Sequence, residues 1–273
     1  MNGDVAMAVL PVLVALVVLW RGLRPLRDVD LARWQARFDA TIPDSDVGFV
    51  TRRLQRSRRV RSTLVAAGLA IGGLPAYMNL IDPARSAEFA NSLVGSAWLF
   101  GAAAGAVIAE VVVDQRPRRR IAALLERRPE DYVDARLVRV VMLAVPVVVA
   151  LAVISTSMRS FDWWEAWVGV VAAVVAAGGV HVGLHAIADR PALDPAGPVG
   201  EVDDALRADG AHHLVGAALA LAATGADAAA PSLDGAGAIP ALLLTVVALL
   251  AYVWWWLLAR DVRWSVRRAR ATA

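Results

Sequence analysis

All four histidines of the chain fall in two neighbouring segments, and they are the side chains best suited to chemistry. His181 and His185 are four residues apart and therefore share one helical face. His212 and His213 are adjacent and point about 100° apart on a helix, so only one of them can join such a site. Glu110 is the most deeply embedded acid of the apolar runs. Ionisable groups at membrane depth are costly, which makes these residues functional candidates.

These residue types predict a metal or cofactor site. Two histidines one turn apart, together with a carboxylate, suit a divalent metal such as Zn²⁺, Mn²⁺ or Fe²⁺. A histidine pair can also clasp haem iron, and a chain of histidines and acids can relay protons. The candidate metal ligands are His181, His185, Glu110 and His212. The competing interpretation is that all of them lie near the water interface, where histidine bonds a neighbouring helix or a headgroup and Glu110 pairs with an arginine such as Arg116 or with a histidine.

Composition and motifs exclude several other chemistries. The chain has no cysteine, which removes thiolate metal sites and cysteine nucleophiles. All 28 basic residues are arginine, which removes a lysine Schiff base and a P-loop lysine. No His-Glu-x-x-His, Gly-x-Ser-x-Gly or Walker pattern is present. Metal-dependent lipid hydrolases with seven spans share the number and orientation of the predicted spans. Here, however, the histidine pair lies on the fifth predicted span and the last span has no histidine, so the order does not match. The sequence therefore favours a protein that is not an enzyme.

Long uncharged runs must position these residues. Hydrophobic residues make up 58% of the 273 positions, and the mean hydropathy is +0.55. A bilayer core needs about 20 helical residues to cross, so we expect one all-α, polytopic membrane domain over residues 1–273. Its seven predicted spans cover about 5–21, 62–81, 92–113, 138–157, 165–188, 211–228 and 238–259. The first is interpreted as a retained anchor and not a signal peptide, because arginines follow it and none precedes it.

The arginines predict the orientation. Of the 28, 25 fall in segments on one side of the predicted spans, and only Arg85 and Arg159 fall on the other. Basic loops stay in the cytoplasm, so we expect the N-terminus outside and the C-terminus in the cytoplasm of a multi-pass protein of the cell (inner) membrane. The cytoplasmic segments are the linkers 22–61, 114–137 and 189–210 and the tail 260–273. Because the arginines lie in these segments, the basic pI of about 10.1 does not indicate nucleic-acid binding.

Two of the linkers contain basic amphipathic stretches. Val47, Val50 and Leu54 form an apolar stripe among the arginines of 44–61, and 117–128 has a similar pattern. Such stretches predict helices that lie on the membrane and meet anionic lipid headgroups, with a protein partner as the alternative. Trp34 is expected to lie flat on the membrane in the same way. The acidic linker 189–210 is the strongest candidate for a contact with a cytoplasmic or membrane protein partner.

Small residues and prolines suggest how the spans pack. Gly101 and Gly105 form a GxxxG pattern, which lets helices approach closely in lipid. Gly178 shares the helical face of His181 and His185, so we expect that face to point into the bundle. A possible hairpin repeat is marked by Arg-Pro at the inner end of three predicted spans. Every hairpin protein needs such stop signals, which is the simpler explanation.

Two stretches resemble known proteins. Arg116 to Val140 (RPRRRIAALLERRPEDYVDARLVRV) and Val202 to Leu214 (VDDALRADGAHHL) are similar to segments of uncharacterised multi-pass integral membrane proteins of actinobacteria. The resemblance implies an inner-membrane location in a Gram-positive organism and implies no activity, substrate or site residue. Proline-kinked spans, small-residue helix faces and short predicted outer loops lead us to expect a non-enzymatic membrane component of a transport or envelope-associated assembly. The alternatives are a metal- or haem-dependent membrane protein and a structural membrane scaffold.

Overall fold

The computed structural model describes residues 2–73, 97–111, 127–157, 163–190 and 198–229. These residues are helical and contain no strand, which confirms the predicted all-α class. The helices are α1 (Asn2–Leu23), α2 (Asp28–Phe38), α3 (Val47–Gly72), α7 (Ala97–Val111), α8 (Ala135–Ser157), α9 (Trp163–Ala188) and α10 (Pro198–Ala229), with a 3-10 turn at Pro129–Asp131. The predicted span 238–259 and nearly all of the predicted helix 117–128 lie outside the described residues.

Two of the described helices are long and apolar enough to cross a membrane. They are α8 over Ala135–Ser157 and α9 over Ala166–Ala188. A third span is obtained if residues Val9–Leu23 of α1 are counted together with α2 as one bent element. Helix α7 contains a shorter apolar stretch, Phe100–Glu110. The fold is therefore that of a helical protein with two to three candidate membrane-spanning helices.

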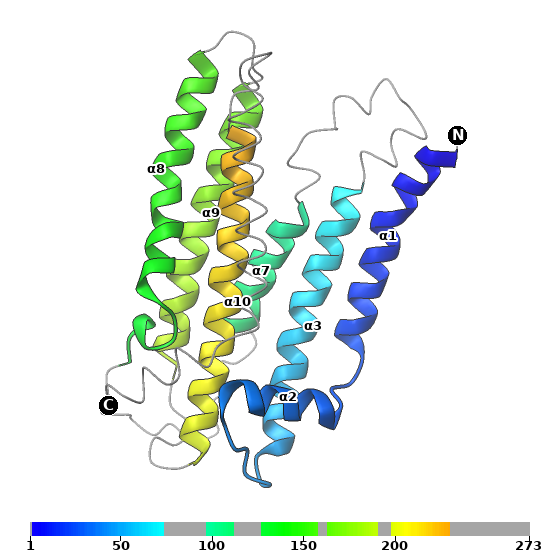
Figure 1. Ribbon diagram of the computed structural model, residues 1–273, viewed down its shortest axis with the longest axis vertical. Coiled ribbons are helices and arrows are strands. Elements are labelled where there is room, and N and C mark those ends of the chain that lie inside the picture. The colour runs from blue at the N-terminus through cyan, green and yellow to red at the C-terminus, as the bar shows by residue number, and fades with distance from the viewer. Residues whose placement is uncertain (1, 74–96, 112–126, 158–162, 191–197, 230–273) are drawn as a thin grey trace.

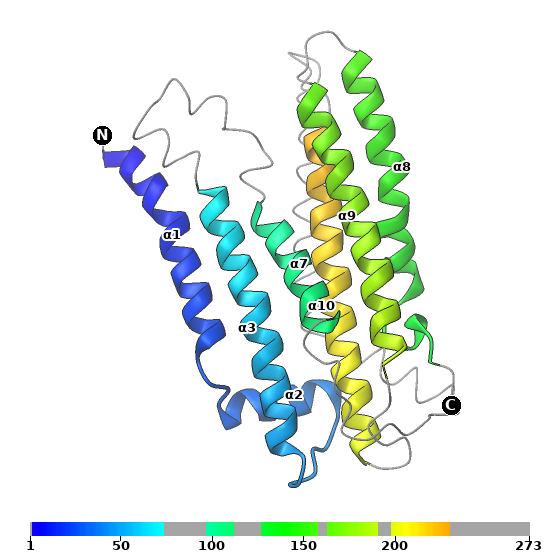
Figure 2. The same ribbon diagram turned by 180° about the vertical axis from the view of Figure 1, so that it is seen from behind.

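The long helices run side by side in two groups that α7 joins (Figure 1). In one group α3 packs against α1, and in the other α9 packs against both α8 and α10. Helix α7 contacts α3 on one side and α9 and α10 on the other. Helix α2 crosses the lower part of α3 at the end of the molecule opposite the N-terminus (Figure 2).

A sharp bend separates α1 from α2, and one side chain of α3 holds it. The two helices meet at 84°. The buried Gln55 side chain accepts a hydrogen bond from the Leu26 amide at 2.8 Å and donates to the carbonyl oxygens of Arg24 at 2.9 Å and Gly22 at 3.2 Å. These bonds satisfy backbone groups that the end of α1 leaves open. Gly22 is needed here, because a Cβ at this position would collide with Ser62.

Beyond the bend, α2, residues 39–46, the first half of α3 (47–61) and the first half of α10 (198–210) form a packed unit that we call the cap. Helix α3 is continuous from Val47, through the predicted start of the second span at 62. Trp34 and Phe38 of α2 are buried in the same hydrophobic core as Val50, and their ring centroids lie 4.9 Å apart. Two expectations are corrected here. Trp34 and the apolar stripe of 44–61 face the interior of the protein and do not lie on a membrane surface, because they pack into one core with Phe38 of α2 and Leu206 of α10.

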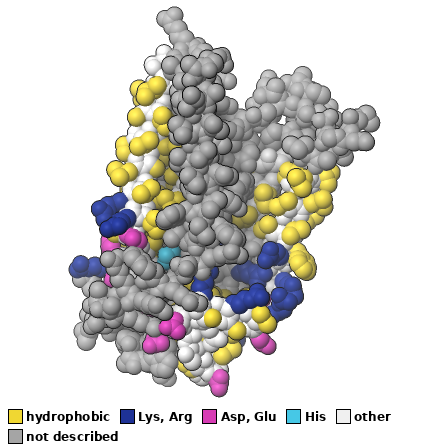
Figure 3. Space-filling view, viewed as in Figure 1, with side chains coloured by type: hydrophobic (Ala, Val, Ile, Leu, Met, Phe, Trp, Pro, Cys, Tyr) yellow, Lys and Arg dark blue, Asp and Glu magenta, His cyan; other side chains and the backbone are white. Residues whose placement is uncertain are grey.

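The outer faces of several helices are strongly apolar. Leu143 on α8 and Trp20 on α1 are 63% and 62% exposed, and aliphatic side chains surround them on both helices. Figure 3 shows hydrophobic side chains over the upper part of the molecule, with arginines in a band beneath them. A soluble monomer rarely exposes contiguous apolar surface of this extent. The surface therefore indicates association with a membrane.

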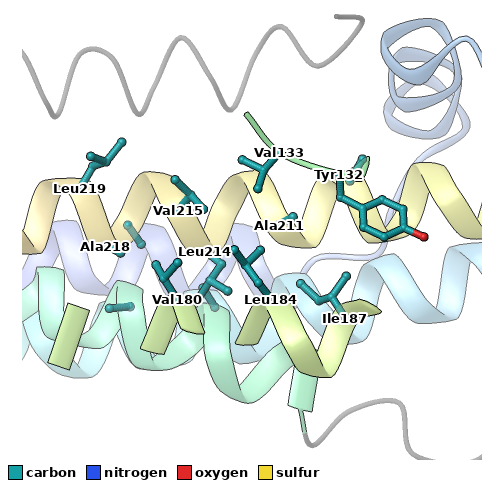
Figure 4. Close-up of a cluster of buried hydrophobic side chains, with 14 of the residues drawn as sticks. Tyr132, Val133, Val180, Leu184, Ile187, Ala211, Leu214, Val215, Ala218 and Leu219 are labelled. Carbon is teal, nitrogen blue, oxygen red and sulfur yellow. The ribbon is translucent and has the colours of Figure 1, made fainter. Parts of the chain in front are cut away.

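Small side chains pack the interior. Val180, Leu184 and Ile187 of α9 meet a row of small and branched side chains from α10, and Tyr132 and Val133 close one end of this cluster (Figure 4). The row on α10 comprises Ala211, Leu214, Val215, Ala218 and Leu219. The GxxxG prediction is confirmed for Gly101 and Gly105, whose backbones touch Leu64 and Arg61 of α3 so closely that a Cβ would not fit without movement.

Candidate functional site: a network of buried charges

Glu110 lies at the end of α7 and joins three parts of the chain. Its side chain is 6% exposed, and its two carboxylate oxygens have different partners. Arg61 of α3 donates to Oε1 at 3.0 Å, and Arg190, just beyond α9, donates to Oε2 at 2.9 Å. A buried carboxylate needs such compensation, because an isolated charge is strongly disfavoured away from water. Glu110 therefore ties the group of α1 and α3 to the group of α8, α9 and α10.

A glycine on α10 makes room for this carboxylate. A Cβ added to Gly210 would lie 2.5 Å from the Glu110 carboxyl carbon and 2.7 Å and 2.8 Å from its oxygens. Any larger residue would push Glu110 away from its arginines. The neighbouring Asp209 extends the network, since its Oδ2 lies 3.7 Å from Arg61 Nη1 and its Oδ1 lies 3.4 Å from His213 Nδ1.

Arg207 is fully buried and closes the end of α9. Its guanidinium donates to the carbonyl oxygens of Ile187 at 2.6 Å, Ala188 at 3.3 Å and Arg190 at 2.7 Å. The last carbonyls of a helix have no partner within the helix and carry partial negative charge, so a buried cation there is doubly favourable. The same guanidinium binds Asp203 Oδ2 through Nε at 3.0 Å and Nη2 at 2.8 Å.

Asp203 and Asp204 connect this capping arginine to the segment before α8. Arg127 lies 3.1 Å from Asp203 Oδ2 and 3.5 Å from Asp204 Oδ1, and Arg53 of α3 lies 3.8 Å from Asp203 Oδ1. The Tyr132 hydroxyl donates to Asp204 Oδ1 at 3.3 Å. Burial raises the pKa of Tyr132 above its usual range and also raises the pKa of Asp204. Tyr132 therefore stays protonated and acts as a donor.

A small cavity opens beside Glu110 where α3, α7 and α10 meet. The space open to the centre of a water molecule is about 10 Å³, which is room for about one water. The lining residues are Arg53, Leu54, Ser57, Arg61, Ala109, Glu110, Leu206 and Asp209. Ser57 Oγ and Arg61 Nε are buried, and neither has a hydrogen-bond partner in the described part of the chain. Two unsatisfied polar atoms at a polar cavity are typical of a bound water site.

Of the histidines predicted as ligands, His181 and His185 lie apart from this network, whereas His212 interacts electrostatically with Asp209. His181 and His185 are exposed on α9, and Gly178 on the same face has open space around it. The expectation that this face points into the bundle is therefore wrong. His212 is buried within α10, and Glu110 is occupied by its two arginines. Among the residues described, no group of three or more His, Asp or Glu side chains is placed to hold a metal ion.

Sequence reasoning missed the arginines that matter most here. It used Arg53, Arg61, Arg127 and Arg207 only to orient the chain, and Arg190 also as a mark of the hairpin repeat, but the structure places all of them in ion pairs. The four-residue spacing of Asp203 and Arg207 was a usable signal, because such a pair meets on one helical face. The partners of Glu110 left no signal, since Arg61 and Arg190 are 49 and 80 residues away in the chain.

Comparison with protein-family models, with curated proteins and with solved structures finds no match to this chain. Function must therefore be argued from the surface, the cap and the charge network.

Proposed function

We propose that this chain is a non-enzymatic, multi-pass integral protein of the inner (cell) membrane and the membrane component of a transport or envelope-associated assembly. In this proposal it has seven spans, including 238–259, with the N-terminus outside and the cap in the cytoplasm. The observation that carries the proposal is the combination of an apolar outer face with a cap whose buried charges are locked to the ends of the spans.

The change from apolar to basic side chains supports this placement. On α1 the exposed Trp20 is followed by Arg21, and Arg24 stacks over the Trp20 ring at 5.6 Å. On α8 the exposed Arg139 is followed by Val140 and then the strongly exposed Leu143. We call the exposed arginines at this level the rim; they are Arg21, Arg27, Arg52, Arg56, Arg59, Arg136 and Arg139. Arginine and tryptophan at the end of an apolar stretch are typical of the membrane interface.

The rim also supports a lipid partner. Its arginines are exposed and adjoin the apolar stretches of α1, α3 and α8 in the chain, and each basic side chain near an anionic membrane contributes about 1 kcal/mol of attraction. Anionic phospholipid is therefore the partner that we propose for this face, beside a cytoplasmic or membrane protein.

The charge network supports an assembly component. Glu110, Arg207 and Asp203 together connect α3, α7, α9, α10 and the segment before α8 at the cytoplasmic end. Such buried ion pairs hold helices in a defined arrangement, and the cavity beside Glu110 places a polar opening at the same level. Asp203 and Asp209 are buried and engaged with arginines, and the half-exposed Asp204 pairs with Arg127. A protein partner is therefore placed on the exposed outer surface of the cap and not on these acids.

The alternative of a structural scaffold has one observation in its favour. The contact between α9 and α10 is filled by alanine and branched side chains, and Gly169 and Gly225 bring the two backbones into direct contact. A bundle packed in this way suits a protein that moves no solute.

Copurification and flux separate these possibilities. The tagged chain would be isolated from native membranes after mild crosslinking, and it would also be reconstituted alone in liposomes loaded with ionic and neutral tracers. We expect a stoichiometric partner that is lost in Glu110→Gln and kept in the rim control Arg59→Gln. A protein that always emerges alone and moves no tracer would contradict the assembly role and favour the scaffold.

A further inference from the structure

We propose that His181 and His185 form a two-histidine chelate for a divalent transition-metal ion on the exposed face of α9. The two side chains are one helical turn apart and exposed, and their ring centroids lie 4.4 Å apart with the rings tilted by 49°. A metal ion binds imidazole nitrogen at about 2.0–2.1 Å, so a single ion can reach two rings at this separation after small rotations. Neither Glu110 nor His212 takes part.

The hydrogen bond of His185 prepares its ring for a metal. His185 Nδ1 lies 2.8 Å from the carbonyl oxygen of His181. A carbonyl oxygen only accepts, so Nδ1 carries the proton and Nε2 of the neutral ring keeps its lone pair. Histidines that bind metals generally donate their other ring N–H to a carbonyl or a carboxylate in this way. The ring therefore has its metal-binding nitrogen available and its orientation fixed.

The surroundings favour a cation and leave room for it. His185 belongs to the last turn of α9, where the helix dipole places partial negative charge. Gly178, one turn before His181, has no atom within 4 Å of the position a Cβ would take. His181 and His185 lie in the last two turns of the candidate span Ala166–Ala188, where interfacial water completes the coordination, because the described residues offer no third protein ligand. Imidazole donors of this kind suit Zn²⁺, Ni²⁺ and Cu²⁺. The site is independent of the proposed transport or assembly role.

The test is metal binding to the full-length chain, purified in detergent with an affinity tag that contains no histidine. Titration with ZnCl₂ is expected to show one saturable site per chain. His181→Ala or His185→Ala leaves a single donor and is expected to weaken binding about 10²-fold, because the chelate advantage is lost. Electron paramagnetic resonance of the Cu²⁺-loaded protein should show coupling to two imidazole nitrogens, reduced to one in either variant.

His213→Ala is the matched control. This ring also binds the carbonyl four residues earlier, Nδ1 to Asp209 O at 2.8 Å, but it is partly buried in α10. Metal affinity is expected to be unchanged in this variant, and thermal unfolding without metal should be unchanged in both His181→Ala and His185→Ala. The proposal is overturned if Zn²⁺ binds only above about 1 mM, or if His181→Ala binds as tightly as the parent protein.

Discussion

Replacing Arg207 tests whether the buried network stabilises the end of the bundle that carries the cap. Arg207→Met keeps an unbranched side chain similar to the aliphatic part of arginine and removes the charge and the donors. The change leaves the carbonyl oxygens of Ile187 and Arg190 without their donor and takes from Asp203 its closest cation. Asp203 keeps Arg127 at 3.1 Å, so its charge is not left alone.

The expected cost follows from these contacts. Breaking a buried ion pair by removing one partner costs about 3–5 kcal/mol. The remaining pairing of Asp203 with Arg127 lowers this cost, whereas the open carbonyls add about 1–3 kcal/mol each. We therefore expect a loss of about 3–5 kcal/mol, which corresponds to a fall in Tm of roughly 6–20 °C for a chain of this size.

The assay is thermal unfolding in detergent, followed by circular dichroism. Arg59→Met is the matched control, because Arg59 is exposed on the rim and its loss should change stability by about 0.5 kcal/mol or less. A double-mutant cycle with Asp203→Asn should give a coupling of about 0.5–3 kcal/mol between the two positions. Equal Tm values for Arg207→Met and Arg59→Met, or strictly additive effects in the cycle, would refute the reasoning.

Four further changes probe other parts of the structure. Gly225→Val should destabilise the bundle by about 1–3 kcal/mol in thermal unfolding, because its Cβ would lie 2.6 Å from the Gly169 carbonyl oxygen. Gly178→Ala, which meets nothing within 4 Å, should raise Tm by roughly 1–4 °C, because alanine inside a helix is favoured over glycine by about 0.5–1 kcal/mol. Gln55→Ala should speed amide hydrogen exchange selectively in α2, because the bend loses the hydrogen bonds of the Gln55 side chain. An equal increase in exchange rate across the whole chain would contradict this. Glu110→Gln should lower stability by about 3 kcal/mol, and unchanged unfolding would show that its two ion pairs contribute nothing.

Hydrophobic runs were enough to predict where most helices lie. The predicted spans 138–157 and 165–188 correspond to α8 and α9 within a few residues, because a run of this length without charges has few alternatives to a helix. The cap was not predictable in the same way. Periodicity marks Val50 as part of an apolar face, but it cannot say whether lipid or another helix covers that face. Here Trp34 and Phe38 of α2 share its core.

The candidate site was only partly predictable for a related reason. Glu110 was recognised as a costly buried acid, and an arginine was one expected partner. The actual partners, Arg61 and Arg190, come from distant segments that meet only in the folded bundle. The face of the histidines was misassigned because Gly178 was read as a packing residue, whereas the small residues that do pack on this helix include Gly169 and Gly183.

Single-cysteine labelling tests the central claim most directly, because the chain has no cysteine of its own. Asn2→Cys marks the N-terminus, and Ser45→Cys marks the exposed surface of the cap. A membrane-impermeant maleimide added to intact cells or spheroplasts should label Asn2→Cys at once, and Ser45→Cys only after the membrane is opened. Labelling of Ser45→Cys from outside, with Asn2→Cys protected, would contradict an inner-membrane protein whose cap faces the cytoplasm.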